Sequence, residues 1–76
     1  MKLHTTLTLK ANIENDDALL TIINPTDTRK IEGTVSDVFE TFEMITNGYA
    51  YCEGYKAEVV KAAPGAIRQI NVYQIN

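Results

Sequence analysis

The only cysteine of the chain and three of its four tyrosines fall within the stretch NGYAYCEGY, residues 47–55. A nucleophilic cysteine needs a base that takes its proton, usually a histidine oriented by a third polar group. His4 is the only histidine, and it falls on the polar side of an expected first strand, so no spacing brings it to Cys52. A lone cysteine is more often a small core residue. The sequence therefore predicts a protein that is not an enzyme.

The tyrosines of this stretch suit a contact surface better than an active site. An extended backbone would place four side chains on one face: Tyr49, Tyr51, Glu53 and Tyr55. Tyrosine combines an apolar ring with a polar tip, which is common at binding surfaces. The alternative is that the rings cover a sheet edge and close a small core. Stacking on RNA is disfavoured, because no basic residue interleaves with the rings before Lys56.

Acidic residues gather in the middle of the chain. No Lys, Arg or His lies between Lys30 and Lys56, whereas this segment holds five carboxylates: Glu32, Asp37, Glu40, Glu43 and Glu53. On a helical wheel, the side opposite the apolar arc carries Asp37, Glu40, Glu43 and Met44. Methionine adapts to the shape of a partner, so this side predicts a protein-contact surface. The alternative is a charged face that is simply solvated.

Metal, cofactor and nucleic-acid sites find little support in the sequence. One His and one Cys are too few for a four-ligand zinc site. Residues 14–17 lack the spaced ligands and distal Glu of an EF-hand loop, and no Gly-rich phosphate loop follows a strand. The net charge of −3 disfavours direct binding of nucleic acid. We therefore expect no metal and no cofactor.

Length and composition indicate one small domain over residues 1–76. A chain this short buries about 60% of the surface that its unfolded form exposes, so an added source of stability is expected. A single cysteine excludes an internal disulfide, which leaves self-association as the expected supplement. The alternating start of the chain is unlike a signal peptide, and no segment approaches membrane-spanning length. We expect an intracellular, cytoplasmic protein.

Alternation of apolar and polar residues predicts strands on both sides of a helix. In residues 2–13 one face carries Leu3, Thr5, Leu7, Leu9, Ala11 and Ile13. Residues 18–24 predict a central strand that Pro25 ends, and residues 28–33 a short edge strand. Residues 49–63 are expected to be extended and broken at Glu53-Gly54, followed by a turn at 63–66 and a strand over 66–75.

The strongest helix signal lies between these strands. Thr34 and Asp37 match a capping box, and Asn47-Gly48 is typical of a helix end. An apolar arc lies between these signals: Val35, Val38, Phe39, Phe42 and Ile45. We therefore predict an α+β fold, in which one amphipathic helix, about residues 35–46, packs on one face of a small antiparallel sheet of four to five strands, in the order β-β-(β)-α-β-β.

These features favour a small non-enzymatic protein-interaction module, an inhibitor or adaptor. Its acidic helix face would bind a basic partner, such as a nucleic-acid-handling protein. The expected contact residues are Asp37, Glu40, Glu43, Met44, Tyr49, Tyr51, Glu53 and Tyr55. In size the chain resembles the small accessory proteins of phages and mobile elements. The alternatives are a homo-oligomer that binds a small ligand at tyrosine-lined subunit interfaces, a structural subunit of a larger assembly, and a cysteine enzyme.

Overall fold

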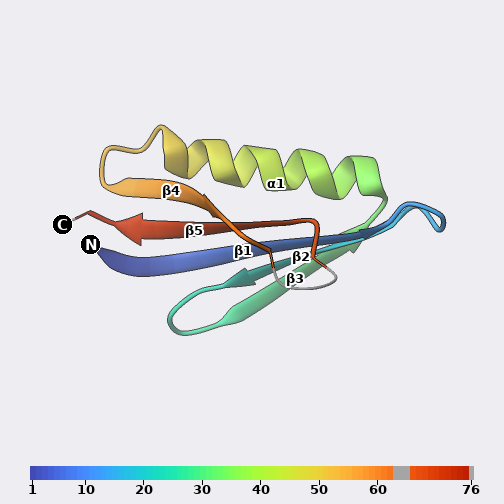
Figure 1. The fold of residues 1–76 in the computed structure, drawn as a ribbon, viewed down its shortest axis with the longest axis horizontal. Helices are drawn as coiled ribbons and strands as arrows, with labels where there is room; N and C mark the ends of the chain where they lie inside the picture. The colour runs from blue at the N-terminus through green and yellow to red at the C-terminus, as the bar shows by residue number, and fades with distance from the viewer. Residues whose placement is uncertain (63–65, 76) are drawn as a thin grey trace.

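A computed structural model describes residues 1–62 and 66–75, and it contains one antiparallel sheet with one helix across one face (Figure 1). The elements in chain order are β1 (Lys2–Asn12), β2 (Asp17–Ile23), β3 (Thr28–Gly33), α1 (Val35–Ala50), β4 (Tyr55–Val60) and β5 (Arg68–Gln74). The strand order is β3-β2-β1-β5-β4, so β1 is central and β3 and β4 are the edges. The predicted α+β fold and element order are confirmed. Of the turn predicted at 63–66, residues 63–65 lie outside the described ranges.

The core lies between α1 and the inner face of the sheet. Alternate residues of the strands point toward α1, as in Leu7 of β1, which is paired with Ile70 of β5. The buried apolar residues are Leu7, Leu9, Ala18, Leu20, Val38, Phe42, Ile70 and Val72. Val35, Phe39 and Ile45 pack partly buried against them, which confirms the predicted apolar arc. Each large side chain that is fully buried here stabilises the fold by about 1.5–3 kcal/mol.

The first strand contains an irregularity that changes which residues face the core. Thr5 of β1 is paired with Val72, and Leu3 is paired with Tyr73, so two steps along β1 correspond to one step along β5. Such an extra residue, here His4, is a β-bulge. Because side chains in a strand alternate between faces, one extra residue moves everything before it to the other face.

The bulge overturns two predicted positions. His4 turns to the helix side, where its ring packs against Tyr49 and Tyr55, so its predicted place on the polar face was wrong. Leu3, predicted on the core face, pairs on the open side of the sheet and is 49% exposed. Ile13, also predicted on the core face, lies in the turn after β1 and is exposed, because the strand ends at Asn12.

The helix begins where the sequence predicts. The Thr34 hydroxyl accepts a hydrogen bond from the Asp37 amide at 3.2 Å, which satisfies a first-turn N–H that has no intrahelical partner. A second acceptor comes from the β1–β2 turn, where the Asp16 carboxylate accepts the Val35 amide at 3.2 Å. Asp16 has a left-handed backbone, with φ 49°, which aspartate tolerates better than most residues. The turn and the helix start are thus tied together.

The helix ends later than predicted. It continues through Asn47 and Gly48 to Ala50, so the predicted end at residue 46 was wrong. One more turn places Tyr49 on the same side as Ile45, where it packs against the core, and this packing outweighs the low helix propensity of glycine. The described residues contain no helix that is long and apolar enough to cross a membrane.

The outer face of the sheet carries neutral polar, charged and apolar side chains, and its neutral polar residues include Thr6, Thr8, Thr21, Gln69 and Asn71. The Thr6 hydroxyl donates to the Asn71 side-chain oxygen at 3.3 Å, and the Asn71 amide donates to the Tyr73 hydroxyl at 3.4 Å. No helix among the described residues covers this face. An antiparallel sheet commonly has one face on the core and one toward solvent.

Candidate functional site

The outward side of α1 carries exposed carboxylates that form no ion pair with the described residues. Asp37, Glu40, Glu43 and Met44 are all exposed, Met44 by 67%, and we call these four residues the acidic face. α1 contains no Lys or Arg. Among the described residues, Arg29 and Asp27 form an ion pair at 3.9 Å, and no residue of the acidic face forms one. Its charge is therefore available to a binding partner.

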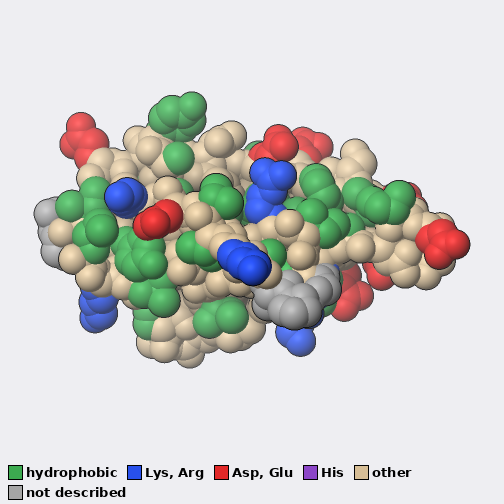
Figure 2. All heavy atoms as spheres, in the orientation of Figure 1, with side chains coloured by type: hydrophobic (Ala, Val, Ile, Leu, Met, Phe, Trp, Pro, Cys, Tyr) green, Lys and Arg blue, Asp and Glu red, His purple; other side chains and the backbone are tan. Residues whose placement is uncertain are grey.

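Acidic and basic side chains are interspersed over the face that Figure 2 shows. Acidic side chains lie along the upper edge, where Figure 1 shows α1, at the right-hand end, where the β1–β2 turn projects, and also at the left and below the middle. Lys and Arg side chains lie over the left and middle of this view, one of them beside the acidic side chains of the upper edge. The acidic face is therefore one of several places that carry negative charge.

The predicted tyrosine face does not form. Tyr49 lies in the last turn of α1, Tyr51 is the C-cap, Glu53 lies in the following turn and Tyr55 begins β4. Tyr51 is 88% exposed, whereas Tyr49 and Tyr55 pack partly buried against the core. The expectation of one extended face was therefore wrong, because the helix continues through residues 49 and 50. Only Tyr51 and Glu53 of the four are exposed.

Tyr49 and Tyr55 instead form an aromatic cluster with His4. The ring centroids of the two tyrosines are 5.2 Å apart at an interplanar angle of 71°, an edge-to-face contact. The His4 ring lies 5.0 Å from Tyr55 and 5.9 Å from Tyr49. Each such contact adds about 0.5–1.5 kcal/mol beyond area burial. Sequence reasoning missed this cluster because the alternation of apolar and polar residues in β1 does not reveal the bulge that turns His4 inward.

A shallow hollow opens beside this cluster at the end of α1. Its volume is about 230 Å³, and its lining residues are Ile45, Gly48, Tyr49, Cys52 and Tyr55; we call it the C-terminal hollow. Cys52 is exposed, which differs from the core position typical of a lone cysteine, because it follows the helix cap. Its amide donates to the Tyr49 carbonyl at 3.1 Å. The hydrogen bonds of the described residues include none between the Cys52 thiol and His4.

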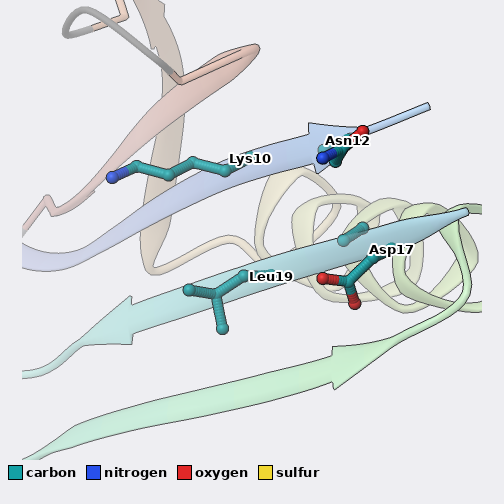
Figure 3. Close-up of a pocket in the computed structure, with 6 residues that line it drawn as sticks. Lys10, Asn12, Asp17 and Leu19 are labelled. Atoms are coloured by element: carbon teal, nitrogen blue, oxygen red, sulfur yellow. The ribbon is translucent and has the colours of Figure 1, made fainter. Parts of the chain in front are cut away.

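Another hollow lies between the ends of β1 and β2. Figure 3 shows Asn12 and Asp17 at the ends of these two strands, with Lys10 extending away from Asp17. The hollow measures about 200 Å³, and the small side chains of the paired Ala11 and Ala18 also line it. Both this hollow and the C-terminal hollow are smaller than the roughly 300–1,000 Å³ typical of sites for small organic ligands.

Comparison with known proteins gave no match: no family model, no curated protein and no solved structure matches this chain. Within the described residues no group of three or more His, Cys, Asp and Glu side chains is arranged to hold a metal ion. The acidic face and the C-terminal hollow are therefore the candidate functional features of the described residues.

Proposed function

We propose that this chain is a non-enzymatic protein-interaction module, an inhibitor or adaptor, that uses the acidic face of α1 to bind a basic partner. The observation that carries the proposal is the run of exposed, unpaired carboxylates around an exposed methionine. Carboxylates at i and i+3, as in Asp37, Glu40 and Glu43, are neighbours on a helix surface, so they form one negative strip. Met44 adds an adaptable apolar contact within it.

A nucleic-acid-handling protein of the cytoplasm is the partner that this chemistry favours. Such proteins carry Lys and Arg clusters that neutralise phosphates, and a strip of carboxylates can occupy the same cluster. Acidic groups of this kind steer the encounter and fix its register more than they add affinity. Binding of the acidic face would block the groove of such a partner, and this is the proposed mechanism of inhibition.

The homo-oligomeric alternative, with a ligand at tyrosine-lined interfaces, has less support. Tyr49 and Tyr55 pack against the core and His4, so of the three tyrosines only Tyr51 has an exposed ring. The solution mass measured by sedimentation distinguishes the alternatives, because a strict monomer has no intersubunit site.

Charge reversal tests the proposed function. The tagged wild-type chain and the variant Glu40→Lys/Glu43→Lys are used to capture partners from extracts of the native host, with identification by mass spectrometry. The affinity for the captured basic partner is then measured at several salt concentrations. We expect the double variant to lose at least about tenfold in affinity and to flatten the salt dependence, because two lysines would face the positive charges of the partner.

A matched control separates the acidic face from net charge. The variant Glu32→Lys/Glu58→Lys makes the same change in charge at two exposed residues of the edge strands β3 and β4. It should bind the partner within about threefold of wild type, because rim or remote charges contribute little to affinity. Equal binding by wild type and the helix variant, or equal loss in both variants, would contradict the proposed function.

A further inference from the structure

Gly48 is a residue whose type the fold itself does not require. It lies inside α1, where glycine weakens a helix relative to alanine. A Cβ placed on it would meet no atom within 4 Å, and its backbone is not left-handed, so neither packing nor conformation demands glycine. Gly48 does line the C-terminal hollow. Gly48 therefore adds no side chain to the wall of that hollow.

The walls of the C-terminal hollow are held in place before anything binds. Tyr49 and Tyr55 contact each other edge to face, and the His4 ring packs against both. These contacts restrict the rotation of the two tyrosine side chains, and a preordered wall lowers the entropy cost of binding. The volume of about 230 Å³ suits one inserted side chain better than a small organic ligand.

The helix end beside the hollow carries partial negative charge. The C-terminal end of a helix carries about half a negative charge, and the last turn of α1 holds no basic residue to offset it. Within the described residues the carbonyl oxygen of Gly48, which lines the hollow, accepts no hydrogen bond. Met44 lies one turn before Gly48, so the hollow also adjoins the acidic face. A cationic donor would find partial negative charge and an acceptor here.

We propose that the C-terminal hollow receives one arginine side chain of the basic partner and anchors the complex. This inference rests on the proposed function, because it assigns an anchor to the same contact. A guanidinium stacks on tyrosine rings and donates several N–H groups to carbonyl oxygens, while its methylene stem lies along apolar surface such as Ile45. Arginine and tyrosine are also enriched among the residues that dominate interface energetics.

The test uses N-acetyl-arginine amide as the probe and the full ¹⁵N-labelled chain as the target. The probe is titrated while amide NMR signals are followed. We expect the signals of Gly48, Cys52 and Tyr55 to shift and saturate with a Kd on the order of millimolar, as befits one side chain. N-acetyl-citrulline amide, the neutral analogue of the same shape, should bind at least about tenfold more weakly. Equal shifts with citrulline, or shifts confined to the acidic face, would overturn the proposal.

Two leucine variants show whether the hollow itself is responsible. Gly48→Leu adds a side chain at a residue that lines the hollow, whereas Asn47→Leu adds the same side chain at an exposed neighbour that does not line it. Leucine is a good helix former, so both variants should keep the fold, and their amide spectra check this. We expect about a tenfold loss of arginine affinity for Gly48→Leu and a change within about twofold for Asn47→Leu. Equal affinities in the two variants would refute the anchor.

The outcomes for the anchor and for the proposed function are separable. Capture of the partner that depends on Glu40 and Glu43 but is unchanged in Gly48→Leu would overturn the anchor and leave the proposed function standing. Arginine binding in the hollow, together with partner capture that tolerates the Glu40 and Glu43 reversals, would support the site and refute the acidic face as the contact.

Discussion

The two ends of α1 differ in how their backbone groups are stabilised. At the N-terminal end, Thr34 and Asp16 each accept a first-turn amide, and the carboxylate of Asp37 complements the positive end of the helix dipole. At the C-terminal end, Gly48 weakens the last turn, and no basic residue offsets the negative end of the dipole. The N-terminal end is thus doubly capped, and the C-terminal end lacks two common stabilising features.

This difference separates a structural region from a candidate functional one. Gly48 and the missing basic residue leave roughly 1 kcal/mol of stability unrealised. Both features lie at the C-terminal hollow, and lower stability is often tolerated where a surface has a function to perform. The N-terminal end, by contrast, joins the β1–β2 turn to the helix and contributes to the fold.

The largest effect is expected from Asp16→Ala at the N-terminal end. This change removes a helix cap, worth about 0.5–2 kcal/mol, and puts alanine in a left-handed conformation that costs about 1–2 kcal/mol. Aspartate already bears part of that conformational cost, so we expect a loss of about 2 kcal/mol in the free energy of unfolding. Urea denaturation monitored by circular dichroism measures it.

Two further substitutions at this position separate the contributions. Asp16→Asn keeps both an acceptor oxygen and tolerance of the left-handed region, so it should lose less than about 1 kcal/mol. Asp16→Gly relieves the backbone but removes the cap, and should fall between the other two. If Asp16→Ala were as stable as wild type, the double capping of the N-terminal end would be disproved.

At the opposite end, Gly48→Ala should have an effect of the opposite sign. Alanine in a helix interior is better than glycine by about 0.5–1 kcal/mol, and the new Cβ meets no atom within 4 Å. We therefore expect the free energy of unfolding to rise by about that amount, with a higher Tm in calorimetry. A lower stability would mean that residue 48 needs glycine for its backbone, and the comparison between the two ends would fail.

The smallest effect is expected from a lysine placed at either end of α1. Ala50→Lys should stabilise the chain by about 0.5 kcal/mol, because a positive charge complements the C-terminal end of the dipole. Ser36→Lys, in the first turn, should destabilise it by a similar amount, about 0.5 kcal/mol. Both residues are exposed, so both effects should shrink in high salt. The same sign at both ends would contradict the dipole argument.

The elements of the fold could be predicted because their signals are local. The alternation in β1, the apolar arc of α1 and the Thr34 cap each lie within a few residues, and the structure has all three, the alternation from Thr5 to Ala11. The helix end was missed because Asn47-Gly48 is a local stop signal, whereas the packing of Tyr49 that overrides it is tertiary.

The candidate site was only partly predictable for the same reason. The exposure of Glu40, Glu43 and Met44 follows from the helical period, so it could be predicted from the sequence. The aromatic cluster and the C-terminal hollow depend on the bulge at His4 and on the meeting of β1, α1 and β4. No spacing in the sequence encodes contacts between residues so far apart.

The strand order has a consequence for how the chain folds as it is made. β5 is synthesised after β1 and β4, yet it lies between them, and the Thr6–Asn71 contact spans 65 residues. Until residues 68–74 leave the ribosome, β1 has an open edge and, among the described strands, β4 has no partner. Because such distant pairings form slowly, we expect the native sheet to close only once residues 68–74 are available, by insertion of β5 between β1 and β4.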